Sequence, residues 1–316
     1  MRRVLVLSVL VVIAALSIGV AAQRGRGPNI PQGPPSQQAL EAAKIEKLKD
    51  NLYVITGSAA GPGGDFSKFS GGNVAVFITG PGVVLVDTKL PLWGPAILER
   101  VRSVTNKPIT TIINTHTHGD HTGSNEFFGA SVESIVQVNT KTNMAKMDAF
   151  KGEKAQFLPK KTFTDKLSVG TGPDRIDLYY FGRGHTNGDA WVVFPTLRVA
   201  HAGDMFAEKG PPIIDATNGG SIVEHATSVA KAAATLTQVD TIIPGHSTMK
   251  TRQDLAEYAA YAKDFIAWAS SEIAAGKTPE QAAAEYKIPD KYKGYAVNGA
   301  FGIEGDVRQA YMELKK

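Results

Sequence analysis

Short runs of β-branched and other apolar residues, each closed by glycine or a polar turn, recur in a fixed order along this chain of 316 residues. Runs of this kind are typical of strands. In the first half, three such runs precede a helix that carries Ile97, Leu98 and Val101 on one face, and a fourth run follows that helix. The four runs are NLYVITG at 51–57, NVAVFITG at 73–80, GVVLVDT at 82–88 and ITTIINT at 109–115. The order of these elements is the strongest constraint on the fold.

The second half of the chain repeats this order. Its elements are strands at 175–181, 190–194 and 197–202, a helix over 221–236, a strand at 241–246 and a long amphipathic helix over 251–276. Two sheets packed face to face with helices outside them would bury these strands on both sides. We therefore predict one α+β domain over residues 46–276, a four-layer αββα sandwich built from two similar halves. A short helical extension is predicted for residues 277–316, where Thr278 and Pro279 form a helix start signal.

The first 45 residues have a different composition from the rest. Residues 1–22 combine a basic start, an apolar run and small residues at Ala21 and Ala22, which predicts a secretory signal peptide. The apolar run is long, so an uncleaved membrane anchor is the alternative. Residues 23–45 are rich in proline, glycine and glutamine and predict a disordered linker. The folded part is therefore expected in the periplasm or outside the cell.

The composition of the chain argues against several classes of function. The formal net charge is +4, and no basic stripe interleaved with aromatic residues is present, so we expect no nucleic-acid partner. No membrane partner is expected beyond an uncleaved N-terminal anchor. The chain has no cysteine, which excludes disulfides, thiolate nucleophiles and thiolate metal ligands.

A histidine cluster lies at the end of one predicted strand, in the stretch NTHTHGDHTG at 114–123. Three further metal-binding side chains follow other strands: His185, Asp204 and His246. Strand ends at one edge of a sheet can hold their side chains around a single point. His116 and His118 are two residues apart and face the same way in an extended segment, whereas Asp120 and His121 follow the flexible Gly119.

These residues can be divided into two metal sites. We predict a first zinc bound by His116, His118 and His185, and a second zinc bound by Asp120, His121 and His246, with Asp204 between the two ions. Imidazole and carboxylate ligands without sulfur favour zinc, with iron and manganese as alternatives. Water on zinc has a pKa of about 7, so hydroxide is available as a nucleophile at neutral pH. Asp120 is the candidate catalytic residue that orients this hydroxide and passes on its proton.

These motifs resemble those of the metallo-β-lactamase-fold superfamily. HTHGDH at 116–121 matches its H-x-H-x-D-H signature, and GRGHTNGD, HAGD and IPGH match its later motifs for the second histidine, the bridging aspartate and the last histidine. The resemblance covers about residues 51–274 and implies the αββα fold. It also implies that Asp87, in VVLVDT, orients the cluster.

Within that superfamily the segment YYFGRGHTNGDAWVVFP looks most like exported class B β-lactamases. Two positions depart from their commonest subclass: Asp204 stands where that subclass has a cysteine ligand, and Ala207 stands where it has a lysine that grips the antibiotic. With an aspartate at the position that bridges the metals, the chain instead resembles hydroxyacylglutathione hydrolases and lactonases. Lys209 is a candidate replacement cation, and Asn218 lies in the loop where β-lactamases bind substrate.

The expected function is an exported binuclear zinc hydrolase that opens an amide or ester bond in a small-molecule substrate, with β-lactams the favoured class. The alternatives are a lactonase or thioesterase, and an iron persulfide dioxygenase with one metal. The two remaining histidines of the folded part are predicted to be structural, since His201 lies on an apolar strand face and His225 on an apolar helix face.

Overall fold

The computed structural model describes residues 33–58, 65–297 and 302–315. The predicted signal peptide lies outside the described residues. A seven-stranded sheet contains the first strands in sequential order, with the later ones running parallel to β4. Its strands are β1 Ile45–Lys49, β2 Leu52–Ile55, β3 Val74–Ile78, β4 Val83–Val86, β5 Ile109–Ile113, β6 Glu133–Gln137 and β7 Lys161–Phe163.

A six-stranded sheet contains the remaining strands in the order β13-β12-β11-β10-β9-β8. Its strands are β8 Lys166–Val169, β9 Ile176–Tyr179, β10 Trp191–Phe194, β11 Val199–Gly203, β12 Thr241–Pro244 and β13 Lys250–Thr251. Strand β10 runs antiparallel to both β9 and β11, and β12 runs parallel to β11. Strands β9, β11 and β12 therefore end at the same edge of this sheet.

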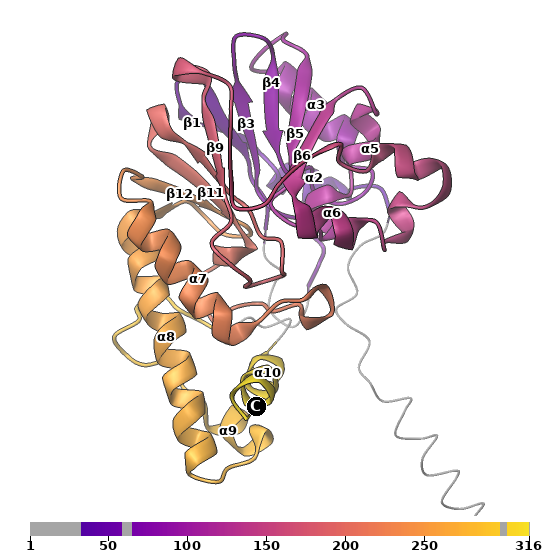
Figure 1. Cartoon of the computed structure of the whole chain (residues 1–316). Coiled ribbons are helices and arrows are strands. Elements are labelled where there is room, and N and C mark those ends of the chain that lie inside the picture. Colours follow the sequence, from indigo (N-terminus) through magenta and orange to yellow (C-terminus); the bar gives the residue numbers. More distant parts are fainter. Residues whose placement is uncertain (1–32, 59–64, 298–301, 316) are drawn as a thin grey trace, which may run out of the picture. The chain divides into compact units, whose positions relative to one another are not determined.

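Helices cover the outer faces of the two sheets, which confirms the predicted αββα sandwich (Figure 1). Helix α3 lies on the first sheet, and α7 and α8 lie along the second, where their apolar faces share a buried cluster with β10 to β12. The helices are α2 Gln37–Ala42, α3 Gly94–Arg102, α4 Gly119–Thr122, α5 Asn125–Phe128, α6 Val138–Met144, α7 Ile222–Thr235, α8 Arg252–Ala274, α9 Pro279–Glu285 and α10 Glu304–Leu314.

The main core lies between the two sheets. Their inward side chains form one buried cluster, within which the rings of Phe77 and Phe194 are 4.9 Å apart. Burying an aliphatic or aromatic side chain of this size contributes about 1.5–3 kcal/mol. This packing holds the two sheets against each other and so determines where their strand ends meet.

Several predicted details are confirmed, and others differ. The helix start signal at Thr278 is a capping box with Gln281, and a second capping box joins Thr251 and Asp254 at the start of α8. Five strands were not predicted, because each is short and carries polar or charged residues: β1, β6, β7, β8 and β13. Helix α2 lies inside the range 23–45 predicted as linker. It is held by Arg100, whose side chain donates to the carbonyls of Leu40 and Ala43.

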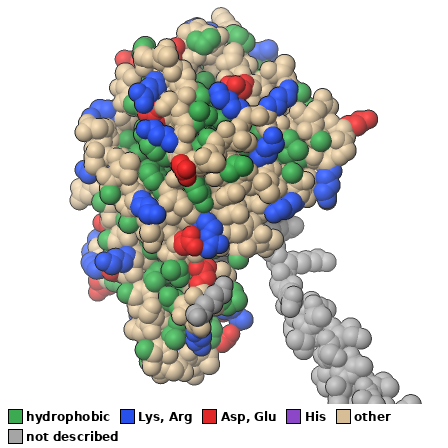
Figure 2. Space-filling model, in the orientation of Figure 1, with side chains coloured by type: hydrophobic (Ala, Val, Ile, Leu, Met, Phe, Trp, Pro, Cys, Tyr) green, Lys and Arg blue, Asp and Glu red, His purple; other side chains and the backbone are tan. Residues whose placement is uncertain are grey.

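Acidic and basic side chains are interspersed over the face drawn in Figure 2, and small apolar groups separate them. Among the described residues, no helix combines the length and apolar character needed to span a bilayer.

Candidate metal centre

The candidate ligands meet where strand ends of the two sheets face each other. His116 follows β5 of the first sheet, while His185, Asp204 and His246 follow β9, β11 and β12 of the second. The direction of the strands explains this arrangement, since β9, β11 and β12 end at the same edge. The short helix α4 then turns the chain so that Asp120 and His121 also reach this point.

The first half-site contains His116, His118, His185 and Asp204, each of which places one donor atom within 4.8 Å of the others. His118 Nδ1 lies 2.8 Å from His185 Nε2. Asp204 Oδ2 lies 3.6 Å from His185 Nε2 and 3.9 Å from His116 Nε2. This is the predicted three-histidine group with the aspartate beside it.

The second half-site contains Asp120, His121 and His246. The Nε2 atoms of the two histidines are 3.2 Å apart, and Asp120 Oδ2 lies 3.3 Å from His246 Nε2. Asp204 also reaches this group, with Oδ1 3.4 Å from His121 Nε2 and Oδ2 3.2 Å from His246 Nε2. The carboxylate of Asp204 therefore lies between the two half-sites.

All five histidines hydrogen-bond outward through one ring nitrogen. The acceptors are Thr115 Oγ1 for His116, Asp215 Oδ2 for His118, Asp87 Oδ2 for His121, the carbonyl of Ile213 for His185 and the carbonyl of Ser58 for His246. Carbonyl and carboxylate oxygens only accept, and the Thr115 hydroxyl already donates to Asp87. In a neutral ring the outward nitrogen therefore carries the proton, and the inward nitrogen presents a lone pair.

These inward lone pairs fit a cation. Two pairs of ring nitrogens face each other at 2.8 and 3.2 Å, each too close for both nitrogens to carry a proton. His116 Nε2 and Asp204 Oδ1 are buried and have no hydrogen-bond partner. Buried polar atoms are normally paired, so such a group of acceptors indicates a metal site. Nitrogen and oxygen donors of this kind suit zinc.

The pKa values of the buried ligands follow from their neighbours. Burial would raise the pKa of Asp204, but the imidazoles of His246 and His121 hold it well below its usual range. Burial lowers the pKa of His116 far below its ordinary value, and the neighbouring His121 and His185 lower it further. An ionised carboxylate and a neutral imidazole are the forms that bind metal.

Asp87 lies behind the cluster at the end of β4. Its Oδ2 is 2.7 Å from His121 Nδ1, and it also accepts from the backbone and the hydroxyl of Thr115. Asp87 has a φ of 66° and Lys89 one of 60°, the left-handed region that L-residues rarely adopt. Strained backbone of this kind persists where surrounding contacts hold it, often at functional sites.

Lys89 is a fully buried lysine that connects two segments beside the second half-site. Its ammonium donates to the carbonyls of Thr56 and Gly72 and to the Ser70 hydroxyl, at 2.8, 2.9 and 3.0 Å. Gly72 in turn leaves no room for a side chain, because a Cβ there would lie 2.2 Å from the ring of His121. The backbone at residues 70–72 is therefore held directly against a ligand.

The centre is most exposed on the side of His118, Asp120 and Asp215. Their side chains are 27%, 14% and 23% exposed, whereas that of His121 is fully buried. Solvent therefore reaches the cluster from this side.

The other predicted residues lie outside the ligand cluster. The amide of Asn218 donates to Asp215 Oδ2 at 2.6 Å, so a contact with substrate would require this bond to break. Lys209 binds Asp254 and Glu257 on α8 at 2.6 and 3.1 Å, and its charge is thus directed away from the cluster.

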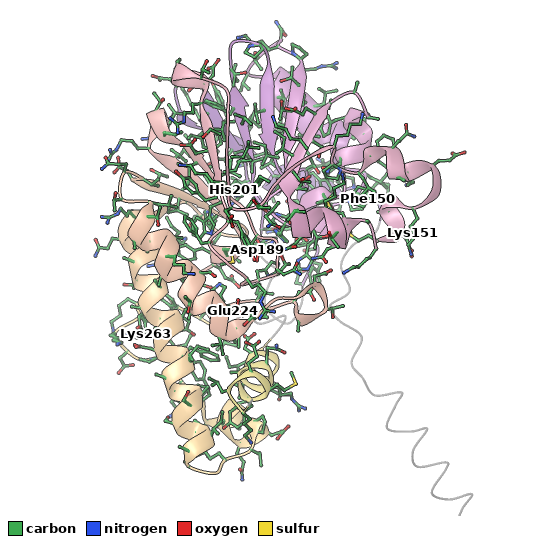
Figure 3. The ribbon with its side chains drawn as sticks, in the orientation of Figure 1. Phe150, Lys151, Asp189, His201, Glu224 and Lys263 are labelled. Atoms are coloured by element: carbon green, nitrogen blue, oxygen red, sulfur yellow. The ribbon has the colours of Figure 1, made fainter. Side chains whose placement is uncertain are left out.

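His201 and His225 have the structural roles predicted for them. His201 lies in the interior of the molecule (Figure 3) and is bonded to the carbonyl of Asn73 and the amide of Gly203. His225 is bonded to the carbonyl of Met205, and burial lowers its pKa to about 4, which keeps its ring neutral.

Sequence reasoning missed Asp215, whose carboxylate orients His118. Its segment, DATNGG, has the composition of a turn, and Asp215 Oδ1 does accept from the backbone of Thr217 and Asn218. The second role, through Oδ2, depends on His118, 97 residues away in the sequence, and no local signal indicates it.

Comparisons with known proteins agree with this geometry. The family model described as "Metallo-beta-lactamase superfamily" matches residues 68–246. The chain belongs to the metallo-beta-lactamase superfamily. Metal-dependent hydrolysis is therefore its enzyme class, as the histidine cluster predicts. The match contains every predicted ligand and ends before the C-terminal extension.

Other members of the superfamily are similar to this chain over most of their own length. "Metallo-beta-lactamase type 2" of Elizabethkingia meningoseptica is 27% identical over 225 residues, which cover 67% of this chain and 82% of that protein. The solved structure of the DIM-1 metallo-beta-lactamase exposed to ceftazidime has a TM-score of 0.57 and 21% identity, covering 70% of this chain and 96% of that one. A metallo-beta-lactamase from Pontibacter korlensis has a TM-score of 0.59 and 16% identity, with 70% and 98% covered. The two solved structures support the fold.

Proposed function

We propose that the protein is an exported binuclear zinc hydrolase that cleaves an amide or ester bond in a small substrate. The observation that carries this proposal is the set of five imidazoles, each hydrogen-bonded outward through one ring nitrogen, around a carboxylate that faces both half-sites. His116, His118 and His185 would hold one ion, Asp120, His121 and His246 the other, and Asp204 would contact both. Bound zinc supplies Lewis-acid polarisation and acidifies water.

The chain's own residues would divide the remaining work. Asp204 is buried and ionised, so its charge compensates the positive charge concentrated at the centre. Asp120 lies on the more exposed side, where its carboxylate can accept a proton from the attacking water and release it to solvent. Asp87 and Asp215 hold His121 and His118 in the orientation that their roles require.

β-Lactams are the first substrate class to test, because relatives named metallo-beta-lactamases cover most of the chain. Lactones and thioesters are the second class, favoured by a specific observation. Asp204 stands at the bridging position, the buried Ala207 offers no charge, and Lys209 is occupied by two carboxylates of α8. A site of this kind has less to attract the carboxylate of an antibiotic.

Metal content and substrate turnover test the proposal together. The purified chain should contain two zinc ions, hydrolyse nitrocefin or a homoserine lactone, and lose that activity on chelation. His116→Ala should abolish turnover, whereas Asp148→Asn, at an exposed position paired with Lys151, should not. A single iron with persulfide oxidation, or full activity in His116→Ala, would overturn the proposal. Nitrocefin turnover without lactone turnover, or the reverse, identifies the substrate class.

A further inference from the structure

The first half-site is supported by the segment of residues 209–221, which leads from Asp204 to helix α7. The carbonyl of Ile213 accepts from His185 Nδ1 at 2.5 Å, and Asp215 Oδ2 accepts from His118 Nε2 at 2.7 Å. The amide of Asp215 also donates to the carbonyl of His185 at 2.8 Å. Two of the three histidines of this half-site thus depend on the position of this segment.

The C-terminal extension holds the same segment near both of its ends. At one end the amide of Ala296 donates to the carbonyl of Lys209 at 3.0 Å. At the other end Glu313 of α10 accepts from the Ser221 hydroxyl at 2.5 Å. Ile214, between these points, packs into a buried cluster formed largely by α8, α9 and α10. Figure 1 shows α9 and α10 beside α8, near the start of α7.

Glu313 also caps helix α7 from outside that helix. Its carboxylate lies 3.2 Å from the backbone amides of both Ile222 and Val223, in the first turn of α7. The first amides of a helix have no partner within it, and a negative charge there is stabilising. Gln309, one turn earlier on α10, donates to Glu313 at 2.6 Å and fixes the carboxylate in place. Ser221, at the end of the supporting segment, and the first turn of α7 are therefore attached to α10 by three hydrogen bonds.

The second half-site takes its support from another part of the chain. His121 is oriented by Asp87 and His246 by the carbonyl of Ser58, and Gly72 donates to the carbonyl of Asp120. These supports precede the histidine cluster in the sequence and belong to the first sheet and the segments next to it. A change in the extension should therefore affect the two half-sites unequally.

We infer that the C-terminal extension is a positioning element for the first metal half-site, and that Glu313 is its positioning residue. This inference rests on one part of the proposed function, namely that the clustered histidines bind metal. The extension keeps Ile213 and Asp215 in register with His185 and His118, so that the inward nitrogens of those two histidines converge on one ion.

Zinc affinity in single half-site variants of the full-length chain tests this inference. His246→Ala retains the first half-site, and His185→Ala retains the second. Adding Glu313→Ala should weaken zinc binding in the first background by more than about twofold and by less than the roughly tenfold loss typical when a group that orients a ligand is itself removed. In the second background the affinity should stay within about twofold of its parent. Competition with a chromophoric chelator measures both.

Two further variants distinguish a positioning role of Glu313 from a general destabilisation of the fold. Glu313→Gln retains an oxygen acceptor for the amides of α7 and should restore most of the affinity. Glu304→Ala removes an exposed carboxylate from the same helix and should leave the affinity unchanged. In the metal-free full-length protein, Glu313→Ala should accelerate hydrogen exchange at the amides of residues 215–221 and leave those of β3 to β5 unchanged.

The outcomes distinguish this inference from the proposed function. If His246→Ala binds no zinc, the proposed metal centre is wrong, and the inference is wrong with it. If His246→Ala binds zinc, and adding Glu313→Ala leaves the affinity unchanged, only the inference about the extension is overturned. Equal weakening in both backgrounds, or faster exchange throughout the chain, would also overturn it.

Discussion

Replacement of Asp215 by asparagine should weaken zinc binding at the first half-site. The bond from His118 to Asp215 joins a ring nitrogen to a charged oxygen at 2.7 Å, and such bonds contribute about 1.5–3 kcal/mol. The two side chains are 27% and 23% exposed, so solvent screening places the value near the lower limit. A loss of about 1.4 kcal/mol corresponds to a tenfold weaker affinity. We therefore expect Asp215→Asn to bind the first zinc about tenfold less tightly.

Asp215→Ala should have a larger effect, because it also removes Oδ1, which accepts from the amides of Thr217 and Asn218. Titration of zinc against a chromophoric chelator, fitted with two constants, measures both variants, and Asp148→Asn at an exposed position is the control. Affinity within about twofold of the parent in both variants would refute the proposed role of the bond.

The pH dependence provides a second measurement of the same bond. Burial opposes protonation of His118, but the hydrogen bond to Asp215 and the charge of Asp120 outweigh it and raise the pKa above 6.5. Since the folded pKa is the higher one, the stability from this contact is full below pH 6.5 and is lost as the pH rises through the folded value. Protons also compete with zinc for His118 over the same range. In Asp215→Asn both effects should move to lower pH, as measured by urea unfolding and zinc titration.

Three further changes have defined outcomes. Lys89→Met should lower the free energy of unfolding by about 2–4 kcal/mol in urea, because three oxygens, two of them in buried contacts, lose their donor; a loss under about 1 kcal/mol would contradict the role of these contacts. Gly72→Ala should weaken zinc at the second half-site by displacing the ring of His121, whereas Gly119→Ala, with open space around its Cβ position, should not; equal affinities would count against the close packing. Chelation should lower the melting temperature, since a ligand at one hundred times its dissociation constant stabilises the fold by about 2.7 kcal/mol; identical melting with and without chelator would argue against bound metal.

The parts of the fold that could be predicted are those with a local signal. The buried strands β3, β4 and β10 are almost wholly apolar, and the capping boxes at Thr251 and Thr278 are short patterns. The candidate ligands His116, His185, Asp204 and His246 could also be proposed from the sequence, because each follows a predicted strand. Strand β6 was missed because its pairing with β5 and β7, rather than its composition, determines its conformation.

The groups that orient the ligands were largely beyond prediction. Asp87 follows a predicted strand and belongs to a known motif, so the resemblance suggested its role. The carbonyls of Ile213 and Ser58 contact His185 and His246, and any residue type can supply a carbonyl. Such contacts depend on how distant segments pack, and sequence pattern carries no information about them.

The two half-sites join segments that are far apart in this cysteine-free chain. His118 and His185 are separated by 67 residues, and His121 and His246 by 125. A bound ion would link each pair much as a covalent bridge does, and closing a loop of about 100 residues removes about 4–5 kcal/mol of chain entropy from the unfolded state. The proposed catalytic ions would then also serve as crosslinks, and scarcity of metal would expose the chain to proteolysis as well as abolish its activity.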